Sequence, residues 1–389
     1  MAGDFNSLLL RRLGRRDFMR YAAVLGGAGV LAACKKAETT PTGPVGTGVQ
    51  RPPIEDEPGI LQVFDWDAYG DGQAGYGDEA LWKAYAKAFP GLEPEFTKFK
   101  DDDSGYAKVA QGDRYDIVHP CGYRWGDWVG LDVLQPWDTS LIASFADLNP
   151  TLTAPGQFDG KQYFITTDWG FAAPMYRSDL VEPEEDSWAL LWDERYADRI
   201  SWWDSLNMLV VAAYFSGIPD PWAMTDEELD QMKGFLISKI GLVRTLWPID
   251  PSEDFINEDV WITYAWPSHW VNAAIWNGLE DTVYMEPKEG RTSWYCGFAL
   301  FADTENYYHA HEYVNAWASA GAAEWLLNNY GYGHTNTAVD LDKVDPGIVS
   351  TFALDDPSVL EEPRSHVERP IARRDVYNDV WEEVKAAAV

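Results

Sequence analysis

The chain has 389 residues, of which 46% are hydrophobic and 14% aromatic, with 20 tryptophans among them. This composition excludes disorder for most of the chain, and the length suggests about two domains. With 63 Asp and Glu against 30 Lys and Arg, the net charge of −33 excludes a nucleic-acid-binding protein. It indicates an evenly acidic, solvated surface, with attraction of cations to a cleft as the alternative.

Residues 1–33 have the features of an export signal, with four arginines between positions 11 and 16 and an apolar run over 21–33. The stretch GRRDFMR at 14–20 resembles the twin-arginine export motif, and LAAC at 31–34 resembles a bacterial lipobox. Together they imply cleavage before Cys34 and a lipid on that cysteine. The alternative is a membrane-spanning helix, but the apolar run of about 13 residues is short for a bilayer core, which needs about 20.

A flexible spacer is predicted over 35–58, because this stretch contains Thr, Pro and Gly and shows no apolar periodicity. Its random-coil reach is about 27 Å. Without 1–33 the chain keeps 25 basic and 61 acidic residues, a net charge of −36. Once Cys34 carries a lipid, Cys121 and Cys296 are the remaining cysteines, and an exported chain meets an oxidising compartment in which they could form one disulfide.

Strands and helices are predicted to alternate beyond the spacer. Short β-branched or buried runs predict strands at 59–64, 115–118, 162–166, 263–266 and 297–301. Apolar residues at helical spacing predict helices at 79–89, 125–129, 206–215, 226–239, 271–277, 308–318, 322–330 and 376–388. This alternation predicts the α/β fold class with two lobes.

Common enzyme and metal signatures are absent from the sequence. There is no G-x-S-x-G elbow, no phosphate-binding loop and no H-E-x-x-H zinc motif. His309 and His311 are two apart on a predicted helix and should point in different directions, which argues against a metal site. The acids at 65–71 do not have the spacing of a calcium loop, and the acids at 101–103 are expected to form a solvated turn.

An ordered set of motifs resembles the spermidine/putrescine-binding proteins of bacterial ABC importers, from about residue 61 to 385. VFDWDAY at 63–69 is similar to the family's first strand and Asn-Trp-x-x-Tyr turn, and YDIVHPCGY at 115–123 is similar to its Tyr-Asp-Leu-Val-x-Pro-Ser-x-Tyr segment. DWG at 168–170 and the tryptophans at 188–192 follow in order, then YAWPS at 264–268. PKEG with Trp294 is the strongest match, and YGYGHTN at 330–336 resembles the family's last turn.

The resemblance implies a type II periplasmic-binding fold, with two α/β lobes joined by two crossings and a ligand between them. Lobe 1 is expected to comprise 59–169 with 267–304, and lobe 2 is expected to comprise 170–266 with 305–389. The resemblance also implies an ABC permease as partner, no cofactor and no catalytic residue. The ligand-binding residues it indicates are Trp66, Asp67, Tyr69, Cys121, Tyr123, Asp168, Trp169, Asp204, Ser205, Trp266, Trp294 and Cys296.

The expected ligand is a polyamine or a related organic cation, because aromatic faces and carboxylates suit an alkylammonium. Two acidic anchors of the family depart here, since only Asp204 remains in the stretch 203–208 and Cys296 replaces the acid that follows the family's tryptophan. Cys121 and Cys296 both fall at aligned site positions, so a disulfide at the cleft and two apolar thiols are equally compatible with the sequence. The alternative ligands are an amino acid, an opine or another small metabolite, and the alternative class is an anchored carbohydrate-active enzyme with paired carboxylates.

Overall fold

The computed structural model describes residues 51–67, 69 and 80–388. The predicted export signal, Cys34 and the spacer up to residue 50 lie outside the described residues. From Arg51 onward the chain forms one compact unit. The flexible spacer predicted over 35–58 is therefore wrong for 51–58, where Glu57 accepts from the Tyr308 and His309 amides at 2.9 and 3.0 Å and Arg51 lies over the Tyr307 ring.

The strands of this unit are β1 (Gln62–Trp66), β2 (Glu95–Phe99), β3 (Ile117–Val118), β4 (Leu134–Gln135), β5 (Gln157–Phe158), β6 (Lys161–Gln162), β7 (Phe164–Arg177), β8 (Ile200–Trp203), β9 (Val243–Trp247), β10 (Ile262–Ala265), β11 (Thr282–Tyr284), β12 (Arg291–Phe301), β13 (Gly333–His334) and β14 (Ser365–Val367). The α-helices are α3 (Lys83–Ala88), α4 (Asp102–Ala110), α5 (Trp125–Gly130), α6 (Pro150–Thr153), α7 (Asn207–Phe215), α8 (Asp226–Lys239), α9 (Ser252–Ile256), α10 (Pro267–Trp270), α11 (Tyr307–Trp317), α12 (Ala320–Tyr330), α13 (Pro346–Phe352) and α14 (Arg374–Ala386). A π-helical segment, η10 (Val271–Trp276), continues α10.

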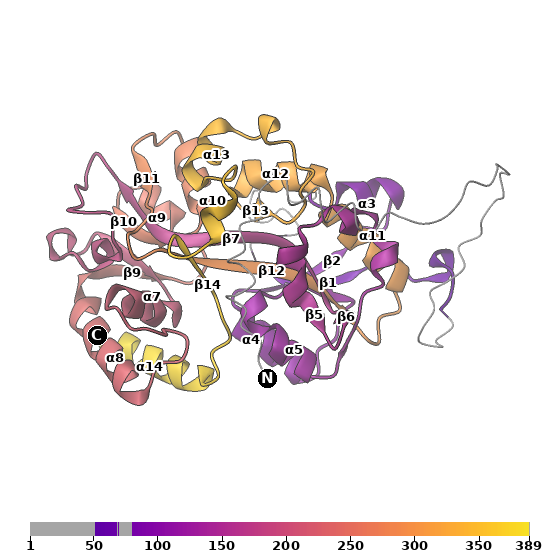
Figure 1. Ribbon diagram of the computed structural model, residues 1–389, viewed down its shortest axis with the longest axis horizontal. Helices are drawn as coiled ribbons and strands as arrows, with labels where there is room; N and C mark the ends of the chain where they lie inside the picture. The colour runs from indigo at the N-terminus through magenta and orange to yellow at the C-terminus, as the bar shows by residue number, and fades with distance from the viewer. Residues whose placement is uncertain (1–50, 68, 70–79, 389) are drawn as a thin grey trace, which may run out of the picture. The chain divides into compact units, whose positions relative to one another are not determined.

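Two long antiparallel strands, β7 and β12, form the centre of the sheet (Figure 1). Their pairing runs from Thr292 opposite Ala172 to Ala299 opposite Phe164, with a register shift between Cys296 and Gly297. Within the described residues the main strand order is β2-β1-β3-β12-β7-β10-β8-β9. The strands β1, β2 and β3 are parallel to one another, as are β8, β9 and β10.

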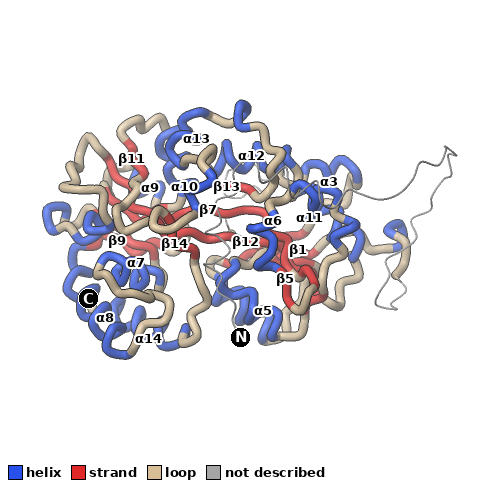
Figure 2. The backbone as a smooth tube through the Cα atoms, in the orientation of Figure 1, coloured by secondary structure: helices blue, strands red, loops and turns tan. Residues whose placement is uncertain are grey.

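The central pair therefore joins two α/β lobes. Helices cover the strands on both sides, as Figure 2 shows. In the first lobe the helices α3, α11 and α12 pack on β1, β3 and β12. In the second lobe α7, α8 and α14 pack on β8 and β10. The α/β architecture with two connected lobes agrees with the sequence prediction.

The lobe boundaries differ from those expected. The resemblance places the segment 305–389 in lobe 2, but α11 and α12 share a hydrophobic core with Leu61, Val63 and Ile117 of lobe 1. Conversely, β11 lies in the segment 267–304, yet it pairs with the end of β7 from Met175 to Arg177 beside β10. Helical spacing identifies the apolar face of a helix but does not show which sheet that face covers.

Helix α8 shows how local sequence sets an element here. Thr225 and Glu228 form a capping box, in which the threonine oxygen accepts from the Glu228 amide and the glutamate accepts from the Thr225 amide. Acids fill the first turn and Lys239 the last, which complements the helix dipole. The observed helix therefore has the predicted bounds of 226–239.

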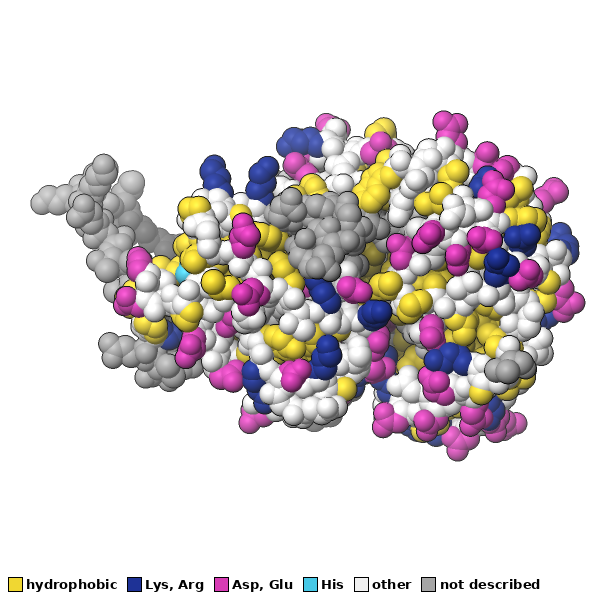
Figure 3. All heavy atoms as spheres, turned by 180° about the vertical axis from the view of Figure 1, so that it is seen from behind, with side chains coloured by type: hydrophobic (Ala, Val, Ile, Leu, Met, Phe, Trp, Pro, Cys, Tyr) yellow, Lys and Arg dark blue, Asp and Glu magenta, His cyan; other side chains and the backbone are white. Residues whose placement is uncertain are grey.

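The surface carries its acidic residues scattered among lysines and arginines over the face shown in Figure 3. Many of them form exposed ion pairs, such as Lys239 with Glu194 at 2.7 Å. Such pairs contribute little stability each. This face agrees with an evenly acidic, solvated surface.

A buried charge cluster ties three strands together. The His119 imidazole follows β3, and its Nδ1 lies 3.0 Å from Asp65 of β1 and its Nε2 lies 2.9 Å from Asp168 of β7. All three side chains are 0% exposed. Burial lowers the pKa of His119, but the charges of Asp168 and Asp65 outweigh it and raise the pKa to about 10. The histidine is therefore an imidazolium between two carboxylates.

Replacement of His119 by alanine should strongly destabilise the protein, because it leaves two carboxylates buried without their cation. We expect a loss of about 3–5 kcal/mol in the free energy of unfolding, measured by urea titration at pH 7. The matched control is His309→Ala, which removes a buried histidine whose pKa is lowered by burial. Equal losses in the two variants would contradict the charge assignment.

Candidate ligand-binding site

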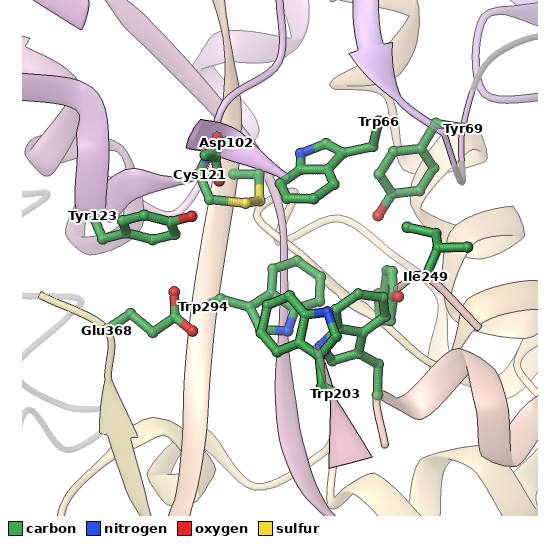
Figure 4. Close-up of a pocket in the computed structure, with 12 residues that line it drawn as sticks. Trp66, Tyr69, Asp102, Cys121, Tyr123, Trp203, Ile249, Trp294 and Glu368 are labelled. Carbon is green, nitrogen blue, oxygen red and sulfur yellow. A yellow bond between two sulfur atoms is a disulfide. The ribbon is translucent and has the colours of Figure 1, made fainter. Parts of the chain in front are cut away.

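A cavity with about 540 Å³ of empty space, counted out to its open mouth, lies where the carboxyl ends of the parallel strands meet. It is lined by Trp66, Tyr69, Asp102, Cys121, Tyr123, Trp203, Ile249, Trp266, Trp294, Cys296, Tyr332 and Glu368. Figure 4 shows these side chains converging from both lobes.

Each lobe contributes through the ends of its strands. Trp66 ends β1, and Cys121 and Tyr123 follow β3, in the first lobe. From the second lobe, Trp203 ends β8 and Trp266 directly follows β10.

The central strand β12 carries Trp294, which lies opposite Gly170 of β7. A Cβ at position 170 would come within 2.5 Å of the Trp294 ring, so the glycine makes room for it. The Trp294 ring meets Tyr332 edge to face at a centroid distance of 4.7 Å.

Seven of the twelve predicted ligand-binding residues line this cavity. They are Trp66, Tyr69, Cys121, Tyr123, Trp266, Trp294 and Cys296. Whether they contact a ligand stays a prediction, but the structure brings them together from segments up to 230 positions apart.

The other five predicted residues do not line the cavity: Asp67, Asp168, Trp169, Asp204 and Ser205. The Asp168 carboxylate pairs with His119 and also accepts from the Tyr69 hydroxyl at 3.0 Å. Asp204 accepts from the Trp381 indole at 2.9 Å and lies 3.1 Å from the Lys385 ammonium.

For Trp169 and Ser205 the local backbone gives the reason. Trp169 pairs with Tyr295, one residue from Trp294, and successive side chains of a strand point to opposite faces. The Ser205 hydroxyl caps the next turn by accepting from the Asn207 amide at 3.3 Å. The Asp67 amide donates to the Phe99 carbonyl at 2.8 Å, which fixes its backbone at the end of the β1–β2 pair.

Sequence reasoning missed Asp102, Trp203, Ile249, Tyr332 and Glu368. The acids at 101–103 do not form a solvated turn, because Asp101 caps α4 by accepting from the Ser104 amide and Asp102 is 0% exposed. An acid at an N-cap followed by two more in the first turn is a helix-start signal that could have located α4. Nothing in the local sequence distinguishes Glu368.

Two carboxyl groups in the cavity have raised pKa values. Burial raises the pKa of Asp102 to about 6, although the Tyr123 hydroxyl, the Cys121 amide and two arginines act in the opposite direction. Burial raises the pKa of Glu368 to about 8, against the charge of Arg374 and with that of Asp102. The cavity thus contains acids that are poorly compensated when they ionise.

An ion pair between the lobes lies beside these carboxyl groups. Arg374, the first residue of α14, donates from Nε to Asp103 of α4 at 2.7 and 2.9 Å. Arg124 also pairs with Asp103, and the Arg374 guanidinium lies 4.7 Å from the centre of the Tyr123 ring. Asp103 is therefore neutralised by arginines from both lobes.

Cys121 and Cys296 form a disulfide that lines the cavity. It joins the segment after β3 to β12, 175 positions along the chain. Of the two possibilities that the sequence left open, the structure has the disulfide.

Comparison with known proteins supports the fold and the resemblance. No family model matches the chain. The spermidine/putrescine-binding periplasmic protein of Escherichia coli (strain K12) is 24% identical over 275 residues, which cover 66% of this chain and 76% of that protein. The protein of the same name from Salmonella typhimurium is 24% identical over 278 residues, with the same coverage.

Among solved structures, a putative spermidine/putrescine ABC transporter from Listeria monocytogenes matches with a TM-score of 0.72 at 19% identity, covering 84% of this chain and 99% of that one. The PBP MotA from A. tumefaciens B6, in complex with glucopine, matches with a TM-score of 0.67 at 16% identity and covers 84% of this chain and 99% of that one. The type II periplasmic-binding fold and the resemblance to spermidine/putrescine-binding proteins are confirmed.

Replacement of Glu368 by glutamine should flatten the pH dependence of stability. The native carboxyl keeps its proton up to a pKa of about 8, whereas the ordinary pKa is 4.5, so the free energy of unfolding falls as the pH rises between these values. The stability of Glu368→Gln relative to the wild type should therefore increase by about 1–3 kcal/mol from pH 5 to pH 8, measured by urea unfolding.

The control for this experiment is Glu305→Gln, which alters an exposed carboxylate. Its pH profile should run parallel to that of the wild type. A parallel profile for Glu368→Gln as well would contradict a buried carboxyl that holds its proton.

Proposed function

We propose that this chain is the solute-binding component of an ABC importer and that it carries a polyamine, such as spermidine or putrescine, or a related organic cation. The observation that carries this proposal is the cavity between two lobes, which is walled by aromatic rings and contains two carboxyl groups. The curated relatives are named as binding proteins and not as enzymes, in agreement with the absence of catalytic motifs. The partners of this function are a small solute and the permease subunits that receive it.

The aromatic wall suits a cation. Trp66, Trp203, Trp266 and Trp294 offer ring faces and edges to one space, and a desolvated cation over such a face gains about 2 kcal/mol. Several such contacts together support micromolar binding without a covalent step. The carboxyl groups of Asp102 and Glu368 supply the negative charge that an alkylammonium requires.

A second candidate is a solute other than a polyamine, such as an opine or an amino acid. It is favoured by two departures at the acidic anchors, since Asp204 lies outside the cavity and Cys296 is in a disulfide. The A. tumefaciens structures with glucopine and agropinic acid show that related folds accommodate such solutes.

We also propose export and a lipid anchor on Cys34. The support is the twin-arginine and lipobox resemblance in 14–34, together with the periplasmic relatives. In the part of the chain that the structure describes, we find no helix with the length and apolarity needed to cross a bilayer. The lipid and the part of the predicted spacer that precedes Arg51 would hold the binding unit close to its permease.

A thermal-shift screen tests the binding function. Putrescine, spermidine, quaternary amines, amino acids, opines and sugars are compared, and a ligand at 100 times its Kd should add about 2.7 kcal/mol to the free energy of unfolding.

Two tryptophan variants test the aromatic wall. Trp294→Ala and Trp266→Ala should each weaken binding of the solute found in the screen by about 1–2 kcal/mol while the protein stays folded. Calorimetric titration measures the affinities.

The matched control is Trp276→Ala, because Trp276 is 41% exposed and does not line the cavity. Its affinity should equal that of the wild type. Unchanged affinity in both cavity variants would remove these tryptophans from the binding site, and stabilisation by none of the solutes would overturn the proposed function.

The anchor is tested by replacing Cys34 with serine in the full chain. The wild type should partition with membranes and with the detergent phase, because one acylated cysteine carries the lipid chains. Cys34→Ser should move to the aqueous fraction, followed by immunoblot after phase separation. Persistence of Cys34→Ser in the membrane fraction would show that another feature holds the protein there.

A further inference from the structure

The acidic groups of the cavity collect at one end. In Figure 4, Asp102, Tyr123 and Glu368 lie on one side, and Trp203, Tyr69 and Ile249 lie on the other. Among the described lining residues, Asp102 and Glu368 are the carboxylates. The cavity is therefore polar at one end and aromatic over the rest.

The two carboxylates come from different lobes. Asp102 begins α4 of lobe 1, and Glu368 follows β14, just ahead of α14 of lobe 2. Each is anchored on one side, since Asp102 Oδ1 accepts from the Cys121 amide at 3.1 Å and Glu368 Oε1 accepts from Asn207 at 3.4 Å.

The second carboxylate oxygen of Asp102 can still accept a hydrogen bond. Oδ2 is buried and accepts no hydrogen bond from the described residues, and the Tyr123 hydroxyl lies near the carboxyl group. A buried carboxylate oxygen without a full partner is a place for a donor from a ligand.

The charges around the two carboxyl groups can be balanced by one further cation. Arg124 and Arg374 both pair with Asp103, whereas Asp102 and Glu368 form no ion pair with them. These three carboxylates and two guanidiniums carry one negative charge in excess when all are ionised. One ammonium bound there would balance the cluster.

The other end of the cavity offers no second anchor among the described residues. Four acids adjoin residues of this region in sequence, Asp67, Asp168, Asp204 and Asp250, and none of them lines the cavity. Asp204 is engaged by Trp381 and Lys385, Asp168 by His119 and Tyr69, and Asp250 accepts from the Ser252 amide at 2.7 Å. The indole N–H groups of Trp66 and Trp294 are hydrogen-bond donors and cannot neutralise a second ammonium.

On the basis of the proposed function, we infer that this site selects organic cations with a single ammonium head. Asp102 and Glu368 hold the head between the two lobes, and the tryptophans enclose an apolar body. A diamine places its second ammonium against aromatic rings, where it loses its water without gaining a carboxylate. The inferred solute class is thus a monoamine or quaternary ammonium compound, and the diamines and polyamines bind more weakly.

Matched ligand pairs test this inference by calorimetric titration of the full chain. Butylammonium and putrescine share a four-carbon body and differ by the second ammonium, so butylammonium should bind at least as tightly. Choline and 3,3-dimethyl-1-butanol share a shape and differ in charge, so the alcohol should bind at least about tenfold more weakly. Putrescine or spermidine binding about tenfold more tightly than butylammonium would overturn the inference.

Variants locate the head group. At pH 9, where the Glu368 carboxyl is ionised, Glu368→Gln and Asp102→Asn should each lower the affinity for butylammonium by about tenfold or more. Asp127→Asn is the control, because it removes a 56%-exposed acid that pairs with Arg124 outside the cavity. Near-ultraviolet circular dichroism checks that each variant is folded, and Glu368→Gln carries the test if Asp102→Asn does not fold. An unchanged affinity in Glu368→Gln would overturn the assignment of the head group.

A pH profile separates charge recognition from packing. The charged and titratable groups that act on Glu368 or respond to it are Asp102, Tyr123, Tyr264, Tyr295 and Arg374. Because the cation favours the ionised carboxylate, the affinity for choline, which keeps its charge at every pH, should rise from pH 6 to pH 9 and then level off. Above pH 7 the rise should disappear in Glu368→Gln, because Asp102 has a pKa of about 6 and is already ionised there. A flat wild-type profile would contradict the inference.

The outcomes separate this inference from the proposed function. If a neutral or anionic solute from the screen binds and none of the four probes does, the single-cation inference fails and the binding function stands. If no solute binds at all, both fail.

Discussion

The antiparallel pair β7–β12 is the element on which the rest of the structure depends. All fourteen residues of β7 are buried, and β12 pairs with β3 and β4 at one end and with β14 at the other. Each lobe adds its own parallel strands to this pair, β1 to β3 on one side and β8 to β10 on the other. The two halves of the cavity are therefore built on one continuous ladder of hydrogen bonds, which positions Trp294 and Cys296 between them.

The buried acids of this region fall into two classes. Asp65 and Asp168 pair with His119, and these ion pairs join β1, the segment after β3, and β7. Asp102 and Glu368 reach the cavity without a cation of their own, while the arginines between the lobes pair with Asp103. A positively charged solute would provide the cation that Asp102 and Glu368 lack, and it would lie at the boundary between the lobes.

The sequence predicted the class of fold and the aromatic wall, because strands, helices and tryptophan motifs can be recognised from residues that are close together in the sequence. It predicted β7 only as far as 162–166, since polar Thr167 and Asp168 interrupt the apolar pattern, whereas the structure buries both by hydrogen bonding. The acidic anchors were the larger error. Asp168 lies beside Trp169 and Asp204 beside Trp203 in sequence. Their carboxylates bind His119 after β3 and Trp381 of α14, which are more than 45 positions away.

Glu368 shows the opposite case. It lines the cavity because β14 pairs with β12, which places Glu368 in the same cavity as Asp102 of α4, more than 260 positions away. No local periodicity or motif predicts that two such distant residues line one cavity. The same holds for the placement of α11 and α12 on the first lobe, which tertiary packing decides.

The disulfide between Cys121 and Cys296 affects the entropy of recognition. It fastens the segment that carries Tyr123 to the strand that carries Trp294, so this part of the cavity wall has few alternative arrangements before a solute arrives. A wall already held in its bound shape loses little conformational freedom on binding, and more of each contact then appears as affinity. In this respect the covalent bond makes one half of the cavity a preformed template, against which the second lobe completes the enclosure.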